Sequence, residues 1–61
     1  MPHWGSLSDE ERAPWLEAAE TELVQNFGLA VWAKTKEKAK ASIRAQRAGN
    51  LYLAQRTKGM Q

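Results

Sequence analysis

The stretch from Trp15 to Phe27 spaces its apolar residues three and four positions apart, which is the period of an α-helix. This stripe consists of Trp15, Leu16, Ala19, Leu23 and Phe27, with Val24 at its edge. A helix of this kind buries one face and needs a second element to cover it. The pattern therefore predicts an amphipathic helix that packs against another part of the chain.

Residues on either side of the stripe indicate where this helix begins and ends. Ser8 and Glu11 have the spacing of a capping box, in which the Ser8 hydroxyl accepts from the Glu11 amide and Glu11 reaches back. Pro14 lies near the end where amides lack helical partners, and we expect a local distortion there. Gly28 can take the left-handed conformation that ends a helix. We predict a helix over about 9–26.

A second helix is expected to follow at once, over about 29–48. Alanine is frequent in this segment, which raises its helix propensity and permits close approach. One face carries Leu29, Trp32, Ala39 and Ile43, together with Lys36. The lysine makes this apolar face narrow, so we expect the helix to be only partly buried. Gly49 and Asn50 form a stop and turn signal.

The segment after this turn allows two structures. Leu51 and Leu53 fit a short third helix or an ordered turn that packs on the hairpin, while an isolated strand would need a partner chain. We expect the helix or turn, and disorder over 57–61. The predicted fold is all-α: a helical hairpin in a single small domain over 1–61.

Composition excludes several ways of stabilising so short a chain. Its 61 residues contain no cysteine and one histidine, His3, so neither a disulfide nor a thiolate zinc site is expected. Helix packing and aromatic residues must then supply the stability, and self-association as a homodimer is an open alternative. No apolar run approaches the ~20 residues of a membrane span, and the N-terminal pattern is not that of a signal peptide. We expect a cytoplasmic or nucleoid-associated protein without a cofactor.

The two halves of the chain carry opposite charge. Residues 1–30 contain six acidic residues and one arginine, whereas residues 31–61 contain eight basic residues and one glutamate. Such asymmetry favours an anionic partner for the second half. The alternative is that the two halves lie side by side and neutralise each other.

Residues 4–23 carry a pattern that resembles a known family. The pattern W-x2-L-S-x2-E-[KR]-x-P-[YW]-x3-A is formed by Trp4, Leu7, Ser8, Glu11, Arg12, Pro14, Trp15 and Ala19. It resembles the junction between the second and third helices of an HMG box. The resemblance implies that Trp4 and Trp15 belong to one small aromatic core around a capped helix start. Three residues precede the pattern, so the resemblance transfers no DNA-contacting residue to this sequence.

The residue content does not favour catalysis. A Ser-His-acid or Cys-His set is not available, and the carboxylates gather at a helix start, where structure explains them. The sequence has neither a glycine-rich phosphate loop nor an EF-hand pattern. We expect a protein that is not an enzyme.

The basic segment AKTKEKAKASIRAQR is the leading functional candidate. On one helix its lysines and arginines form rows that can follow the phosphates of DNA, with alanine and serine keeping the surface slim. The predicted contacts are Lys34, Lys36, Lys38, Lys40, Arg44 and Arg47. Arg44 and Arg47 are the ones expected to make bidentate contacts. The simpler interpretation is a solvated helix face.

The three tryptophans support a second interpretation. Trp4 and Trp32 can serve as interface anchors, which makes the alternative function a protein-interaction module or small regulator that docks on a larger partner. At helical spacing in a small protein, however, Trp15 and Trp32 are expected to lie in the core.

Overall fold

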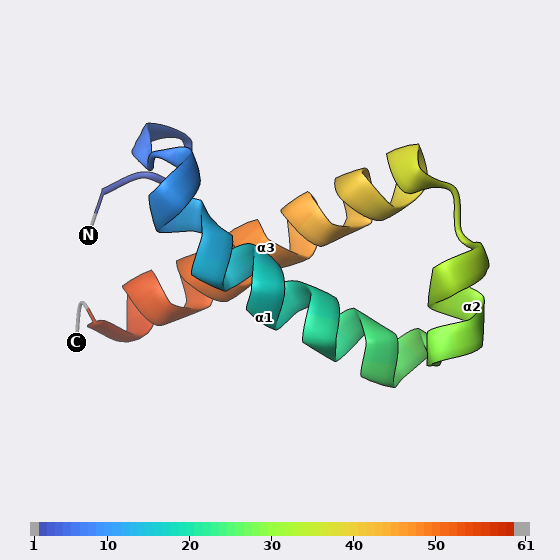
Figure 1. Cartoon of the computed structure of the whole chain (residues 1–61). Helices are drawn as coiled ribbons and strands as arrows, with labels where there is room; N and C mark the ends of the chain where they lie inside the picture. Colours follow the sequence, from blue (N-terminus) through green and yellow to red (C-terminus); the bar gives the residue numbers. More distant parts are fainter. Residues whose placement is uncertain (1, 60–61) are drawn as a thin grey trace.

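The computed structural model describes residues 2–59 of the chain as a run of helices. A single 3-10 turn, η1, comes first and spans Trp4–Ser6. It is followed by three α-helices: α1 at Asp9–Phe27, α2 at Leu29–Lys34 and α3 at Glu37–Gly59. The long helices α1 and α3 cross each other, and α2 joins them at one end (Figure 1). The predicted all-α helical hairpin is confirmed.

The start of α1 follows the predicted capping box. The Ser8 hydroxyl accepts a hydrogen bond from the Glu11 amide at 3.2 Å, and the Ser8 amide donates to Glu11 Oε1 at 2.9 Å. Asp9, Glu10 and Glu11 fill the first turn, where the helix dipole favours negative charge. The helix continues through Pro14, whose ring removes the amide that would bond to the Glu10 carbonyl.

Gly28 ends α1 and begins α2. Its amide donates to the Val24 carbonyl at 2.8 Å, and its carbonyl accepts from the Trp32 amide at 2.9 Å. Its φ of 87° is positive, as predicted for a terminating glycine, but its ψ of 144° is extended and differs from the left-handed value of about 47°. Other residues rarely adopt this backbone conformation, so glycine allows the chain to change direction here.

The predicted helix over 29–48 is wrong, because the chain leaves the helical conformation at Thr35 and Lys36. Thr35 has a ψ of 139°, and its amide donates to the Trp32 carbonyl at 3.2 Å. Its hydroxyl donates to the Val31 carbonyl at 2.9 Å. In a continuing helix, this carbonyl would accept from the Thr35 amide. At this end of α2 the Val31 carbonyl is thus satisfied by the threonine side chain.

This break also divides the apolar face that was predicted for the second helix. Trp32 is 4% exposed, whereas Leu29 is 70% exposed and Ala39 is exposed as well. Ile43, on α3, is half-buried. The four residues thus have no common buried face.

The predicted stop at Gly49 and Asn50 is also wrong, since both lie inside α3. Glycine in a helix interior costs about 1 kcal/mol, but burial of one large apolar side chain contributes about 2–3 kcal/mol. Tyr52 is 3% exposed and Ala48 is fully buried, so packing on both sides of the glycine holds the helix together. A Cβ at Gly49 would lie 3.8 Å from the Trp4 ring, an ordinary contact distance.

The C-terminal segment therefore belongs to α3 and is not a separate short helix. Leu51 is half-buried, but Leu53 is 52% exposed, so only one of the two packs as expected. Of the stretch predicted to be disordered, 57–59 is helical, and 60–61 lies outside the described residues.

One aromatic cluster joins η1, α1 and α3. The centroid of the Tyr52 ring lies 5.6 Å from that of Trp4 and 5.3 Å from that of Trp15. The planes of Tyr52 and Trp15 meet at 87°, so these two rings pack edge to face. The Tyr52 hydroxyl donates to the Pro2 carbonyl, and Leu7 is buried beside η1. Trp4 and Trp15 thus both pack against the same residue of α3.

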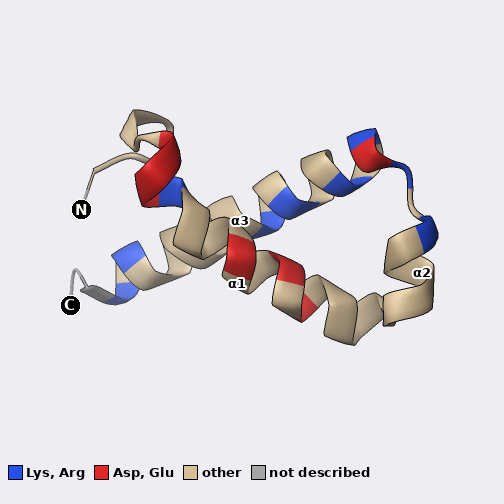
Figure 2. Ribbon diagram, viewed as in Figure 1, with Lys and Arg blue, Asp and Glu red and all other residues tan. Residues whose placement is uncertain are grey.

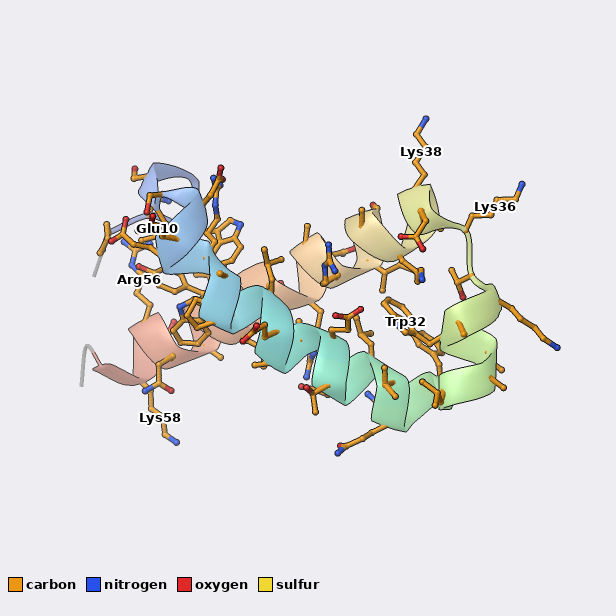
Figure 3. The ribbon with its side chains drawn as sticks, viewed as in Figure 1. Glu10, Trp32, Lys36, Lys38, Arg56 and Lys58 are labelled. Atoms are coloured by element: carbon orange, nitrogen blue, oxygen red, sulfur yellow. The ribbon has the colours of Figure 1, made fainter. Side chains whose placement is uncertain are left out.

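A second cluster fills the space between α1 and α3 on the side of α2. Trp32 points into this space (Figure 3) and stacks on Phe27 with ring centroids 6.2 Å apart and planes 3° from parallel. Its Nε1 donates to Glu20 Oε1 at 3.3 Å, and the Lys40 ammonium lies 6.0 Å from the ring. Between the clusters, Ala19 and Ala48 have no exposed surface, and such small side chains let helices approach closely.

Candidate nucleic-acid interface

The six basic residues predicted to contact phosphate lie on three parts of the chain. Lys34 ends α2, Lys36 is in the following turn, and α3 carries Lys38, Lys40, Arg44 and Arg47. Figure 2 shows basic residues around the turn and along α3. Because the chain leaves the helix at the turn, the six side chains do not lie in rows along one continuous helix, as was expected.

The two arginines of this set reach toward α1. Arg44 Nη1 lies 3.7 Å from Glu20 Oε2, and Arg47 forms an ion pair with Glu22. All four side chains are between 33% and 44% exposed, so solvent screens the pairs and each contributes only about 0.2–1 kcal/mol. Part of the acidic half of the chain therefore neutralises part of the basic half.

Lys40 is also engaged within the molecule. Its Nζ lies 2.9 Å from Glu37 Oε1, and its side chain is only 18% exposed. The hydrogen bond from Lys40, with its positive charge, lowers the pKa of the Glu37 carboxyl below its ordinary value. The ammonium also lies above Trp32, so it faces the space between the helices.

The other three lysines are exposed and make no ion pair with the residues that the structure describes. We call Lys34, Lys36 and Lys38 the outward lysines. Figure 3 shows Lys36 and Lys38 extending away from the molecule near the α2–α3 turn. This end of the molecule therefore offers three positive charges within five residues that no described residue neutralises.

Neither tryptophan that was predicted as a possible partner-binding residue is well exposed. Trp32 is buried between the helices, as expected for a core residue. Trp4 is half-buried, with Tyr52 and Gly49 on one side and the Arg12 guanidinium 6.0 Å from its ring. Both rings are thus largely occupied by contacts within the chain.

Sequence reasoning placed two apolar residues in the core that the structure exposes. Phe27 is 49% exposed at the end of α1, and Leu29 is among the most exposed large residues of α2. Val31, which the predicted stripes left out, is 57% exposed. The interrupting Lys36 was the only sequence signal that this region is incompletely buried.

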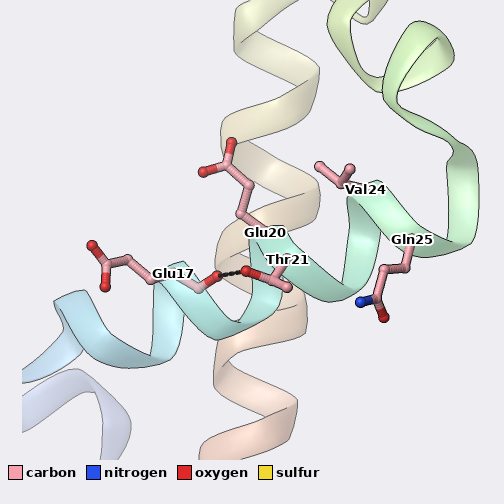
Figure 4. A pocket seen from close by; sticks show the side chains of 5 residues that line it. All are labelled: Glu17, Glu20, Thr21, Val24 and Gln25. Atoms are coloured by element: carbon pink, nitrogen blue, oxygen red, sulfur yellow. Dashed lines mark hydrogen bonds between the residues drawn. The ribbon is translucent and has the colours of Figure 1, made fainter.

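A shallow hollow of about 620 Å³ lies along α1 and is shown in Figure 4. Its lining residues are Glu17, Glu20, Thr21, Val24 and Gln25. Thr21 donates to the Glu17 carbonyl at 3.1 Å, and Glu20 is engaged by Trp32 and Arg44. Its two carboxylates, those of Glu17 and Glu20, are fewer than the three protein ligands of a catalytic zinc site.

Within the described part of the chain, no three histidine or acidic side chains come together in a way that would hold a metal ion. None of the helices of residues 2–59 combines the length and apolar character needed to cross a bilayer.

Comparison of the chain with family models, curated proteins and solved structures gives no match. The likeness to the HMG box therefore stays a prediction from residues 4–23.

Proposed function

We propose that the protein is a small, non-enzymatic DNA-binding protein that contacts phosphates through the outward lysines. The observation that carries this proposal is that Lys34, Lys36 and Lys38 are exposed at one end without a neutralising partner among the described residues. Phosphate contacts require just such accessible cations, and they supply most of non-specific binding.

Two of the predicted residues, Arg44 and Arg47, are left out of this contact set because both form ion pairs with α1. To reach DNA, Arg44 and Arg47 would have to leave Glu20 and Glu22. The same argument applies to Lys40, which is paired with Glu37 and covered. The proposed surface is therefore half of the set that the sequence predicts.

Three lysines favour weak binding with little sequence preference. An ammonium group is a point charge without the planar fork that reads a guanine edge, so these contacts position the protein but do not identify bases. Binding should weaken with salt because each phosphate contact releases counterions.

A titration of fluorescently labelled random-sequence duplex DNA tests the proposal with two matched variants. Lys36→Gln/Lys38→Gln and Arg56→Gln/Lys58→Gln remove the same charge from opposite ends of α3 and its preceding turn (Figure 3). We expect the first variant to weaken binding about tenfold and the second less than about threefold. Equal losses in both would show that net charge alone, and not this surface, determines binding.

The second candidate function is a protein-interaction module, and the exposed side chains of Leu29 and Val31 specifically favour it. Exposed apolar residues beside charged ones are typical of partner-binding surfaces. In this second candidate function, the docking residues lie on α2. Trp4 and Trp32 are not among them, because both have contacts within the chain.

A further inference from the structure

Nearly the whole surface of α2 is apolar and exposed. Trp32 is its only buried residue, and Leu29 and Val31 are 70% and 57% exposed. Four residues form what we call the outer surface of α2: Leu29, Ala30, Val31 and Ala33. With 100° between successive residues, these positions and Lys34 span about 200° of the helix. An apolar surface of this kind offers no cation or hydrogen-bond donor to a DNA phosphate.

The outer surface of α2 is also held in place. Gly28 fixes its start, and the Thr35 hydroxyl bond to Val31 fixes its end. Trp32 anchors the opposite face through its hydrogen bond to Glu20 and its stacking on Phe27. A surface that is ordered before binding loses less entropy when a partner docks.

Positive charge is built into this apolar surface. By helical spacing Lys34 lies between Ala30 and Val31, while Lys36 and Lys38 follow in the turn and the first turn of α3. The complementary surface must therefore combine apolar side chains with carboxylates beside and among them.

We propose that the outer surface of α2 and the outward lysines dock an acidic amphipathic helix of a partner protein. The inference goes beyond the proposed function, and because the two share the outward lysines, the helix competes with DNA for them. A helix laid on an apolar surface is a common recognition mode. A lipid bilayer fits less well, because membrane-binding faces keep lysine at their border and Lys34 interrupts this one.

The test uses a synthetic peptide of about 18 residues, roughly five helical turns, built from Glu, Leu and Ala. Its leucines are placed at helical spacing to form one stripe, and a control peptide has the same composition in scrambled order. Calorimetric titration should give binding to the amphipathic peptide that is at least about tenfold tighter than to the scrambled one. Equal affinity for both peptides, or no binding to either, would overturn the proposal.

Two variants separate the apolar contact from charge. Leu29→Ser/Val31→Ser should weaken peptide binding about tenfold or more, whereas Leu53→Ser, which alters a leucine on α3 that is 52% exposed, should change it less than about twofold. Circular dichroism confirms that each variant keeps its helices. Equal losses in both variants would contradict docking at α2.

A DNA arm distinguishes failure of this inference from failure of the proposed function. We expect Leu29→Ser/Val31→Ser to retain DNA binding and the amphipathic peptide to displace DNA from the unaltered protein. If the peptide binds and DNA does not, the proposed function fails and docking at α2 stands. If vesicles of phosphatidylserine bind through Leu29 and Val31 while the peptide does not, the occupant is a bilayer and the inference is wrong.

Discussion

At the scale of single residues, Ser8 shows how one side chain determines where a helix begins. Its hydroxyl and amide both bond to Glu11, which satisfies two groups that a helix end leaves free. In a chain of 61 residues such a local contribution is a sizeable part of the total stability.

Ser8→Ala should lower the free energy of unfolding by about 1 kcal/mol, because the Glu11 amide loses its acceptor. Urea unfolding followed by circular dichroism measures this change. Ser6→Ala, at an exposed residue of η1 outside the capping box, is the matched control and should stay within about 0.5 kcal/mol of the unaltered protein. A cap substitution without effect would mean that α1 is held by packing alone.

The same contact predicts a pH dependence. Hydrogen bonds from the Ser8 backbone and then its side chain lower the pKa of Glu11 from its ordinary 4.5. Because the folded pKa is the lower one, this stabilisation is present above about pH 4.5 and is lost as pH falls through the folded value. Unfolding measured from about pH 6 to about pH 3 should show a smaller loss of stability in Glu11→Gln than in the unaltered protein. Superimposable pH profiles would contradict this assignment.

At the scale of helices and turns, two glycines have opposite roles. Gly28 has a φ of 87° that ends α1, whereas Gly49 lies inside α3 with room for a Cβ against Trp4. Residue type alone does not separate these two roles, since tertiary packing decides them.

Gly49→Ala should therefore stabilise the protein by about 0.5–1 kcal/mol, because alanine fits and reduces the freedom of the unfolded chain. Gly28→Ala should destabilise it by about 1–3 kcal/mol, because its backbone conformation is strained for any residue with a Cβ. Urea unfolding of both variants checks the two signs. A destabilising Gly49→Ala would show that α3 requires glycine for another reason.

The bounds of a helix can be predicted from the sequence when residues close together in the chain determine them. The bounds of α1 were predictable because its cap and apolar stripe are both local. The ends of α2 and α3 were not, because the chain leaves the helix at Thr35 without a glycine or proline to indicate it, and the buried Tyr52 carries α3 across Gly49. Long-range packing of this kind leaves little trace in residue type.

At the scale of the whole molecule, the crossing of α1 and α3 sorts the charges of the chain. The side of α3 that faces α1 pairs Arg44 and Arg47 with glutamates, while the bend at the α2–α3 turn leaves the outward lysines exposed. The sequence predicted the basic segment as a whole but not this division, which depends on the break at Thr35. Figure 2 shows basic residues around the α2–α3 turn and along α3, and Figure 3 shows Lys36 and Lys38 extending outward near the turn.

The salt dependence of DNA affinity tests this division most directly. The slope of log K against log salt is about −0.9 per phosphate contact, so the outward lysines alone predict about −2.7 and all six basic residues about −5.4. Between about 50 and 200 mM salt these slopes correspond to losses of about 40-fold and more than about 1,000-fold. A slope near −2.7 supports DNA binding by the three outward lysines. A slope near −5, or no saturable binding at the lower salt, would contradict it.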